Sequence, residues 1–555
     1  MHTGTGIRAI ALATVALFVV AACSGFSGSG GLASAQELRV NIAHEPGTFD
    51  PNRTQLNYEA AVDRNIFESP LKASMDFKSV LPNAADSFTV DSTGTVYTFK
   101  LHPGAKWSDG QPVKAADFVY GWQRILDPRV AAPYSSYYYA IKNAAKVNGM
   151  DPKASGIDAA VQSLGLKAVD DNTFEVTLEG PASYFKWIAS LWTSAPVRKD
   201  IVEKYGKDSS GNDKWAAVSA DAAQTVIGNG QFKISEVVSK DHITLVQNPS
   251  YSGNSPKATL TKITLYEIED PVVEFAKYKS GELDITAIPL AQTEAVRNSP
   301  ELLKTPELTV FWVDINVTKA PFDNPKVRLA FAQAIDRDAL VNNVLKKGYS
   351  ATTLIPQGMR NYRPDLGAPQ KFDATTAKAT LAASGVTPEQ LKGVKYIYIS
   401  TSSTAKTIAQ FVQEQLKTNL GVDIVLDGFD SNTVSSRLGN GNYQFGGPSG
   451  WGADYPDSQD WFDIMMTGAG NNFSKWSNST YDNAVKSGDV AADDAQRDAF
   501  YETAEKTIVS DAPIIFLYQR TAWHLVKPYV KGAVSTPIDD FVGDLFTYTM
   551  QITAH

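Results

Sequence analysis

Residues 97–122, YTFKLHPGAKWSDGQPVKAADFVYGW, combine the signals of a strand, a turn and a helix in one short segment. The apolar residues of 96–101 suit a strand, and Asp109-Gly110 supplies the residue types that a tight turn needs. The spacing of Phe118, Val119 and Trp122 predicts the buried face of a helix. The segment therefore predicts a strand, a turn and a helix that follow one another directly.

The same alternation of strand and helix signals continues along the rest of the chain. Because 555 residues exceed what one hydrophobic core usually supports, two or three domains of mixed α and β structure are expected. The predicted strands are 37–43, 96–101, 173–178, 243–247, 263–268 and 394–400, and the predicted helices are 115–126, 272–280, 325–346, 405–419 and 493–510.

The composition argues against several classes of partner and cofactor. The 60 acidic residues outnumber the 51 basic ones, and an acidic surface repels the phosphates that a nucleic-acid-binding protein must neutralise. The single cysteine, Cys23, excludes a disulfide within the chain, and the 6 histidines are too far apart in sequence to indicate a metal site. We therefore expect no nucleic-acid partner, no metal and no cofactor.

The amino terminus has the pattern of an export signal. Arg8 precedes an apolar run over 9–22, which at about fourteen residues is too short to span a bilayer comfortably. The run ends in VAAC at residues 20–23, which resembles the lipobox of bacterial lipoproteins, and in such a signal the thiol of Cys23 takes the lipid. The alternative is a chance cysteine, with cleavage after residues 33–35, but that site lies far beyond the apolar run.

The expected mature chain starts with a tether. Residues 24–35 are almost only Gly, Ser and Ala, so we expect a signal peptide over 1–22, a flexible tether over 23–35 and a folded body from about Gln36. No later segment has eighteen uninterrupted apolar residues, the length that a membrane-spanning helix needs. The expected location is the outer face of the bacterial cytoplasmic membrane, held by the lipid on Cys23, which is the periplasmic side in a Gram-negative cell.

The segment 97–122 resembles the signature of the family 5 extracellular solute-binding proteins. Within that family, GWGADY at residues 450–455 resembles the oligopeptide-binding proteins of ABC peptide importers most closely. The resemblance covers residues 36–555. Further stretches that fit in the same order are Asp127-Pro128, Pro133-Tyr134, Asn229-Gly230, YKSGELD at 278–284, FDNPKVR at 322–328, Ile335-Asp336-Arg337 and LVKP at 525–528.

The resemblance implies an α/β fold of the periplasmic-binding-protein type (class II), with two lobes, an extra domain and three domains in all. Ligand is enclosed when the lobes close about a hinge, and the closed monomer then meets the permease subunits of its ABC transporter. The implied segments are 36–67, 195–307 and 525–555 for domain I, 68–194 for domain II, and 308–524 for domain III.

The resemblance also implies a set of peptide-binding residues. Asp454 is expected to pair with the peptide's α-ammonium, and Ser449, Gly450 and Trp451 to form an edge strand that bonds its backbone. The remaining matches are Gln55, Leu56 and Asn57 as the opposing backbone contact, Tyr134 and Trp312 as aromatic wall positions, and Arg437 as a partner for the peptide carboxylate. The alternatives are a cap or turn at Asp454, packing for the wall and backbone positions, and an ordinary surface arginine at 437.

Several positions depart from the family pattern. Leu345, with Lys346 beside it, and Ala405 stand where relatives carry basic residues, so the preferred peptide length is expected to differ. Gly452 and Thr309 replace a pair of cysteines found in relatives of enteric type, and Pro448 cannot donate a hydrogen bond near the expected edge strand.

Catalysis is not expected from this sequence. It contains no G-x-S-x-G elbow, no H-E-x-x-H pair and no phosphate-binding glycine loop. The expected function is capture of oligopeptides for import. The alternative is a family 5 protein for dipeptides or for a non-peptide ligand such as a nickel chelate, haem or an oligosaccharide, which the fold alone does not separate.

Overall fold

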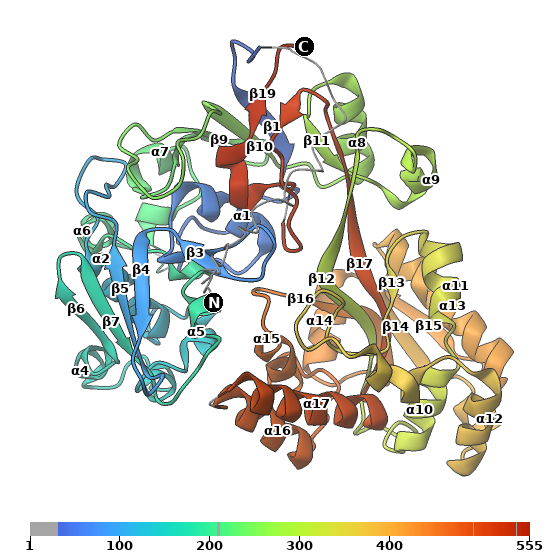
Figure 1. Cartoon of the computed structure of the whole chain (residues 1–555). Coiled ribbons are helices and arrows are strands. Elements are labelled where there is room, and N and C mark those ends of the chain that lie inside the picture. Colours follow the sequence, from blue (N-terminus) through green and yellow to red (C-terminus); the bar gives the residue numbers. More distant parts are fainter. Residues whose placement is uncertain (1–30, 208–210, 212, 492, 540) are drawn as a thin grey trace, which may run out of the picture.

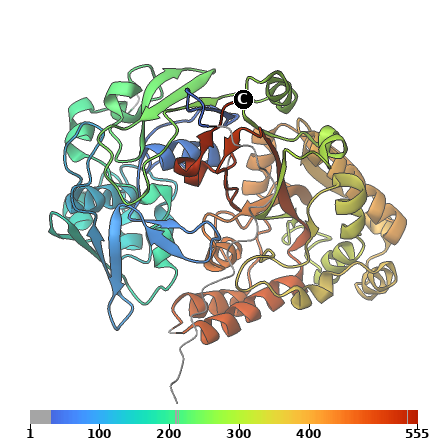
Figure 2. The same ribbon diagram turned by 45° about the horizontal axis from the view of Figure 1, so that its top comes forward.

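The computed structural model describes residues 31–207, 211, 213–491, 493–539 and 541–555. The expected signal peptide and Cys23 lie outside these residues. Figures 1 and 2 show two lobes: the first is built from the blue-to-green part of the chain together with the red carboxyl terminus, and the second from the yellow-to-orange part. The predicted α/β class and multi-domain organisation are confirmed.

The first lobe contains two four-stranded sheets, β1-β10-β9-β8 and β4-β5-β7-β6. Its strands are β1 (Glu37–Asn41), β2 (Leu71–Ala73), β3 (Val80–Pro82), β4 (Ala85–Val90), β5 (Val96–Leu101), β6 (Leu166–Asp170), β7 (Thr173–Thr177), β8 (Phe232–Val238), β9 (His242–Gln247), β10 (Lys262–Tyr266), β18 (Val530–Lys531) and β19 (Gln551–Ile552). Its helices and 3-10 turns are α1 (Asn57–Ile66), α2 (Ala115–Leu126), η1 (Ser135–Tyr138), α3 (Ala144–Asn148), α4 (Ile157–Gln162), α5 (Phe185–Ile188), η2 (Trp192–Ser194), α6 (Lys199–Tyr205), η3 (Lys214–Ala216), α7 (Ala222–Thr225), α8 (Pro271–Ser280), η4 (Leu290–Gln292), α9 (Thr293–Val296) and η9 (Asp544–Thr549).

A seven-stranded sheet of order β11-β17-β12-β16-β14-β15, with β13 beside β17, forms the centre of the second lobe, and its β11 end extends into the first lobe beside β1. The strands are β11 (Ile285–Ala287), β12 (Leu302–Ile315), β13 (Tyr349–Ser350), β14 (Lys395–Ile399), β15 (Val425–Phe429), β16 (Phe445–Gly452) and β17 (Ile514–Val526). The helices are α10 (Pro325–Gln333), α11 (Arg337–Ala339), η5 (Leu340–Leu345), η6 (Pro364–Gln370), α12 (Ala374–Ala383), η7 (Pro388–Leu391), α13 (Ser403–Leu420), α14 (Ser431–Gly439), α15 (Gln459–Phe462), η8 (Asp463–Met465), α16 (Ser479–Asp489) and α17 (Asp494–Asp511).

The predicted strand, turn and helix of residues 97–122 are confirmed as β5, a turn and α2. Trp107, Phe118 and Trp122 are fully buried, and Gly110 has a φ of +87°, a conformation that favours glycine in the turn. The Asp117 carboxylate accepts a hydrogen bond from the Lys114 backbone N–H at 2.9 Å, which caps the start of α2. Interactions between residues close in sequence are therefore sufficient to account for this strand, turn and helix.

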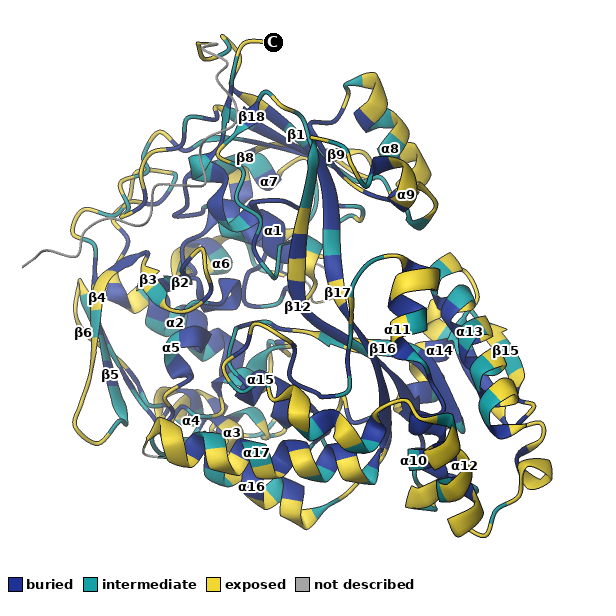
Figure 3. Cartoon of the chain, turned by 45° about the vertical axis from the view of Figure 1, so that its right-hand side comes forward, coloured by how far each residue is buried: buried dark blue, intermediate teal, exposed yellow. Residues whose placement is uncertain are grey.

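Both faces of the second sheet are buried. On β17, Ile515 and Leu517 pack with the helices α10, α12 and α13, whereas Ile514 and Phe516 pack on the opposite side with α16 and α17. This alternation follows from the two-residue period of a strand. Figure 3 shows the result: strands coloured as buried between helices whose outer faces are exposed.

Two expectations about element boundaries were wrong. The helix predicted over 325–346 ends at Gln333, because Asp336 caps a new helix by accepting from the Ala339 N–H at 2.9 Å. The tether was expected to extend to residue 35, but the Ala33 N–H donates to the Ile552 carbonyl at 2.9 Å. Small residues do not prevent backbone pairing, so the described body already begins at residue 31.

Two long strands, β12 and β17, run through both lobes (Figure 1). They pair from Leu302–Leu525 to Pro306–Thr521, and regular pairing resumes only at Val310–Gln519. The predicted domain boundary at 307/308 falls at this irregularity, and the boundary at 524/525 falls inside β17. An interrupted two-strand ribbon is a natural place for a hinge, because few hydrogen bonds resist bending there.

Candidate functional site

The predicted edge-strand residues lie on β16. Ser449, Gly450 and Trp451 pair with Trp312, Phe311 and Val310 of β12. On the other side, β14 pairs with β16 only at Phe445 and Gly446. Beyond Gly446, that side of β16 therefore has no strand partner among the described residues and is open to an added strand.

Pro448 lies where the pairing with β14 has ended. The register of β16 against β12 is irregular at this point, between Trp312 and Asp314. Since a proline nitrogen carries no hydrogen, the open edge starts with a missing donor. How far a peptide could pair with this edge stays a prediction.

Asp454 follows β16 and lies against the first lobe. Its Oδ1 accepts a hydrogen bond from the Tyr134 hydroxyl at 2.8 Å, and its Oδ2 accepts one from the Tyr137 hydroxyl at 2.6 Å. Tyr134 precedes η1 and Tyr137 lies within it, and their rings are stacked with centroids 4.8 Å apart. Among the described residues, no cation forms an ion pair with Asp454.

The environment of Asp454 disfavours its charged form. Burial raises the pKa of its carboxyl, and the hydroxyls of Tyr137 and Tyr134 and the charge of Arg64 only partly offset this effect. The neighbouring Asp460 accepts from the Asp454 backbone N–H at 2.9 Å. Burial and then the charge of Asp454 raise the pKa of Asp460 well above its ordinary value. The site thus holds two carboxyl groups that no cation of the described residues contacts directly.

The nearest arginines already have partners. Arg64 Nη1 lies 2.8 Å from Asp544 Oδ2, and its guanidinium carbon lies 5.2 Å from the ring centroid of Trp192. Arg520 forms an ion pair with Glu307. Neither arginine forms an ion pair with Asp454, although the charge of Arg64 partly offsets the effect of burial on its pKa.

Arg64, Glu307, Arg520 and Asp454 line a cavity of about 30 Å³ between the lobes. This volume holds about two or three water molecules, because a water needs roughly 10–15 Å³ by the same measure. A peptide could therefore enter only if the lobes first separated, as the predicted hinge allows.

Gln55, Leu56 and Asn57 lie at the start of α1. The backbone N–H groups of Gln55 and Leu56 donate to Glu59 Oε2 at 2.8 and 3.0 Å. The Gln55 carbonyl accepts from the Tyr134 hydroxyl at 3.4 Å, and Asn57 lines the same cavity as Asp454. Because Glu59 occupies these two donors, a ligand could use them only by displacing the Glu59 carboxylate.

The other predicted residues do not gather around Asp454. Trp312 is 3 % exposed, packs in the core beside α16 and α17, and donates to Asp314 Oδ1 at 3.0 Å, which favours the packing alternative. Arg437 lies on α14, with its guanidinium 4.1 Å from the ring centroid of Phe429, and forms no ion pair among the described residues. It thus remains a cation that a carboxylate could reach.

The positions that depart from the family pattern have structural roles here. Leu345 and Ala405 are buried, whereas Lys346 is exposed, so the first two contribute to packing. Thr309 and Gly452 face each other across the β12–β16 ladder. A Cβ added to Gly452 would lie 3.0 Å from Thr309 Oγ1, so this close contact exists without a crosslink.

Sequence reasoning missed Tyr137, Asp460 and Arg64. The spacing of Tyr134 and Tyr137 by three residues was a usable signal, because residues three apart in a helical turn share a face. Nothing local indicated that this face would meet Asp454, more than 300 residues away in sequence. Within the described ranges, no group of three or more His, Cys, Asp or Glu residues is placed to hold a metal ion.

Comparison with known proteins identifies the family. Residues 79–473 match the profile described as bacterial extracellular solute-binding proteins, family 5. The chain belongs to this family. Family 5 is a family of solute-binding proteins and not of enzymes, and no helix in the described part of the chain is long and apolar enough to cross a membrane.

Individual family 5 proteins resemble the chain over nearly its whole length. The periplasmic oligopeptide-binding protein OppA of Salmonella typhimurium is 33 % identical over 528 residues, which cover 93 % of each chain. The murein tripeptide-binding protein MppA of Escherichia coli has a TM-score of 0.79 at 28 % identity, covering 94 % of this chain and 100 % of that one. The substrate-binding domain of an oligopeptide ABC transporter from Bacillus anthracis has a TM-score of 0.76 at 26 % identity, with coverages of 94 % and 100 %.

Proposed function

We propose that this family 5 protein captures oligopeptides with a free α-amino group outside the cytoplasm and delivers them to the permease of an ABC importer. The observation that carries the proposal is the carboxylate of Asp454. It lies between the lobes, and burial raises its pKa. Among the described residues, its side chain is bound only by the neutral hydroxyls of Tyr134 and Tyr137. A carboxylate in such a place is suited to a cation that arrives with the ligand.

A peptide supplies both this cation and the strand that β16 lacks. Its α-ammonium could donate to Asp454 beside the tyrosine hydroxyls, because an ionised carboxylate can accept several hydrogen bonds. Its backbone could add to the open side of Ser449, Gly450 and Trp451. Such pairing is indifferent to side chains, as a general peptide receptor requires. Arg437, which has no ion pair among the described residues, is the proposed partner of a peptide carboxylate.

The remaining parts of the proposal follow from the sequence. Lipid on Cys23 would hold the monomer at the outer face of the membrane, and the three predicted domains would close about the β12–β17 ribbon. The resemblance to peptide importers and the peptide names of the relatives support the same assignment.

The decisive experiment compares free and N-acetylated forms of one peptide. Isothermal titration with wild type is expected to show binding of the free tripeptide and at least about a hundredfold weaker binding of its acetylated form, since breaking a buried charge pair costs about 3–5 kcal/mol. Asp454→Ala is expected to abolish the difference, whereas Asp323→Asn, at an exposed aspartate of the same lobe, is expected to keep it.

Native mass spectrometry of protein purified from rich medium tests the ligand class directly. Co-purified peptides would support the proposal. A non-peptide ligand whose binding is unaffected by Asp454→Ala would contradict it and favour another family 5 specificity.

A further inference from the structure

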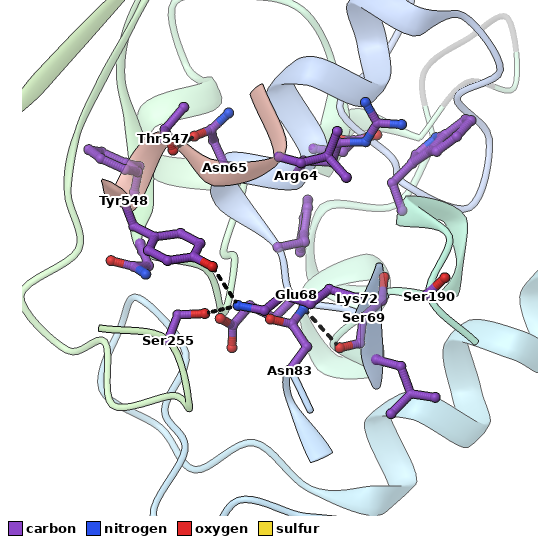
Figure 4. Close-up of a pocket in the computed structure, with 17 residues that line it drawn as sticks. Arg64, Asn65, Glu68, Ser69, Lys72, Asn83, Ser190, Ser255, Thr547 and Tyr548 are labelled. Carbon is purple, nitrogen blue, oxygen red and sulfur yellow. Dashed lines mark hydrogen bonds between the residues drawn. The ribbon is translucent and has the colours of Figure 1, made fainter. Parts of the chain in front are cut away.

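A second polar cavity lies in the first lobe, where all three predicted segments of domain I meet domain II (Figure 4). Its volume is about 70 Å³, room for several water molecules or one very small organic molecule. Arg64 and Trp192 line both this cavity and the one beside Asp454, and so stand between the two. The cavity is distinct from the proposed peptide site.

One side of the cavity presents an ammonium group without an anionic partner. Lys72 Nζ donates to Ser255 Oγ at 2.5 Å and to the Tyr548 hydroxyl at 3.1 Å, and it lies 4.5 Å from the Tyr548 ring centroid. Figure 4 shows the Lys72 amine reaching toward both hydroxyls. Lys72 forms no ion pair with any described residue. An ammonium has three N–H donors, so one donor remains available.

The same cavity is lined by a carboxyl group with a free oxygen. Glu68 is only 7 % exposed, and its Oε1 accepts from the Tyr251 hydroxyl at 2.7 Å. Its Oε2 accepts no hydrogen bond from any described residue. Burial raises the pKa of Glu68 to about 7, although Tyr251, Lys72 and His102 oppose this effect.

Lys72 and Glu68 together disfavour a ligand that carries charge of only one sign. A lone anion at Lys72 would be repelled by ionised Glu68, and a lone cation at Glu68 would be repelled by Lys72. Glu68 and Lys72 both line the cavity and form no direct ion pair, so each can still take a partner of opposite charge from a ligand in the cavity. An α-amino acid carries an ammonium and a carboxylate one carbon apart, which matches this need.

We propose that this cavity binds a free α-amino acid with a small side chain, whose carboxylate accepts from Lys72 Nζ and whose ammonium donates to Glu68 Oε2. The small volume limits the side chain to that of glycine or alanine. Such a ligand would tie Ser255 and Tyr548 of domain I to Glu68 and Lys72 of domain II. Its binding would stabilise the first lobe, because a ligand that binds only the folded state stabilises that state.

The test is titration of the extensively dialysed full chain with glycine, followed by isothermal calorimetry and thermal unfolding. Glycine and L-alanine are expected to bind and to raise the Tm, whereas L-phenylalanine, acetate and methylamine are not. Glu68→Gln and Lys72→Met are each expected to weaken glycine binding at least about tenfold, since hydrogen bonds to charged groups contribute about 1.5–3 kcal/mol. The matched control is Lys78→Met, at an exposed lysine close in sequence, and it should bind glycine as wild type does.

Asp454→Asn separates this proposal from the peptide site, because an amino acid could also offer its ammonium to Asp454. Glycine binding that persists in Asp454→Asn and is lost in Lys72→Met would support the second site. Absence of glycine binding at 10 mM, or equal binding of acetate or methylamine, would overturn it and leave a cavity that holds only water.

Discussion

Two groups of carboxylates lie where separate parts of this molecule meet. One group pairs with an arginine, and the other accepts hydrogen bonds from tyrosine hydroxyls. At the junction of α2 with the loops around residues 50 and 213, Arg124 donates to Asp50 at 2.6 and 2.9 Å and to Asp213 at 3.0 Å. Between the lobes, Asp454 receives only tyrosine hydroxyls, and no cation pairs with it among the described residues. The first arrangement is complete within the chain, and the second leaves a charge for something else.

This difference separates structural from ligand-binding carboxylates better than burial does. Asp50 is fully buried, whereas Asp454 is only partly buried, so burial alone would rank Asp50 higher as a candidate. What distinguishes Asp454 is the lack of a permanent cation together with donors from the opposite lobe. We therefore expect substitutions at the Arg124 group to lower stability and substitutions at Asp454 to lower peptide affinity.

The largest expected effect is on stability, from Arg124→Met. The change leaves Asp50 and Asp213 without their cation, and breaking a buried ion pair from one side costs about 3–5 kcal/mol. Urea unfolding should show this loss, while peptide affinity at a temperature where the variant is folded should equal that of wild type. A large loss of affinity would show that the two groups are not separable.

Asp454→Asn should lower peptide affinity and leave stability nearly unchanged. Peptide affinity is expected to fall by about 2–5 kcal/mol, the usual cost of removing one partner of a buried charge pair. The free energy of unfolding without ligand should stay within about 1 kcal/mol of wild type or rise, because a neutral amide avoids the burial of an unpaired charge. Strong destabilisation in urea unfolding would assign Asp454 to the structural class.

Tyr137→Phe should have a smaller effect on binding. It removes one donor from Asp454, and hydrogen bonds to charged groups contribute about 1.5–3 kcal/mol. The matched control is Tyr138→Phe, whose hydroxyl bonds only to Thr193 and Ser194 inside the first lobe. We expect calorimetry to show weaker peptide binding for the first variant only, and the second to lose stability instead. Equal effects of the two variants on affinity would show that the Tyr137 hydroxyl has no specific role in peptide binding.

The smallest effect should be a gradual dependence of stability on pH. Burial raises the pKa of both Asp454 and Asp460 in the folded protein, so protonation favours the folded state. Their contribution is complete below the ordinary carboxyl pKa of about 4 and is lost as the pH rises through the raised values. Asp460→Asn should flatten this decline in ligand-free protein, as measured by urea midpoints from pH 5 to 8. Parallel curves for variant and wild type would contradict the charge coupling.

Local signals in the sequence predicted a large part of the fold but little of the detailed site. The strand and helix of residues 97–122 were correct because adjacent residues determine turns and helix faces. The helix over 325–346 was wrong because the Asp336 side chain offered the backbone an alternative, which a hydrophobic period does not reveal. The hydrogen bonds from the Gln55 and Leu56 backbone N–H groups to Glu59 were not indicated by the sequence motifs.

The sequence by itself determined the α/β class, because turns and helix faces depend on neighbours in the chain. Its short motifs indicated the family and singled out Asp454 as a candidate ligand-binding residue. Only the tertiary structure decided that Tyr137 would meet Asp454, that β16 would keep an open side, and that Trp312 would pack in a core. The reason is physical: a hydrogen bond between residues 317 positions apart depends on how two lobes meet, and no local propensity carries that information.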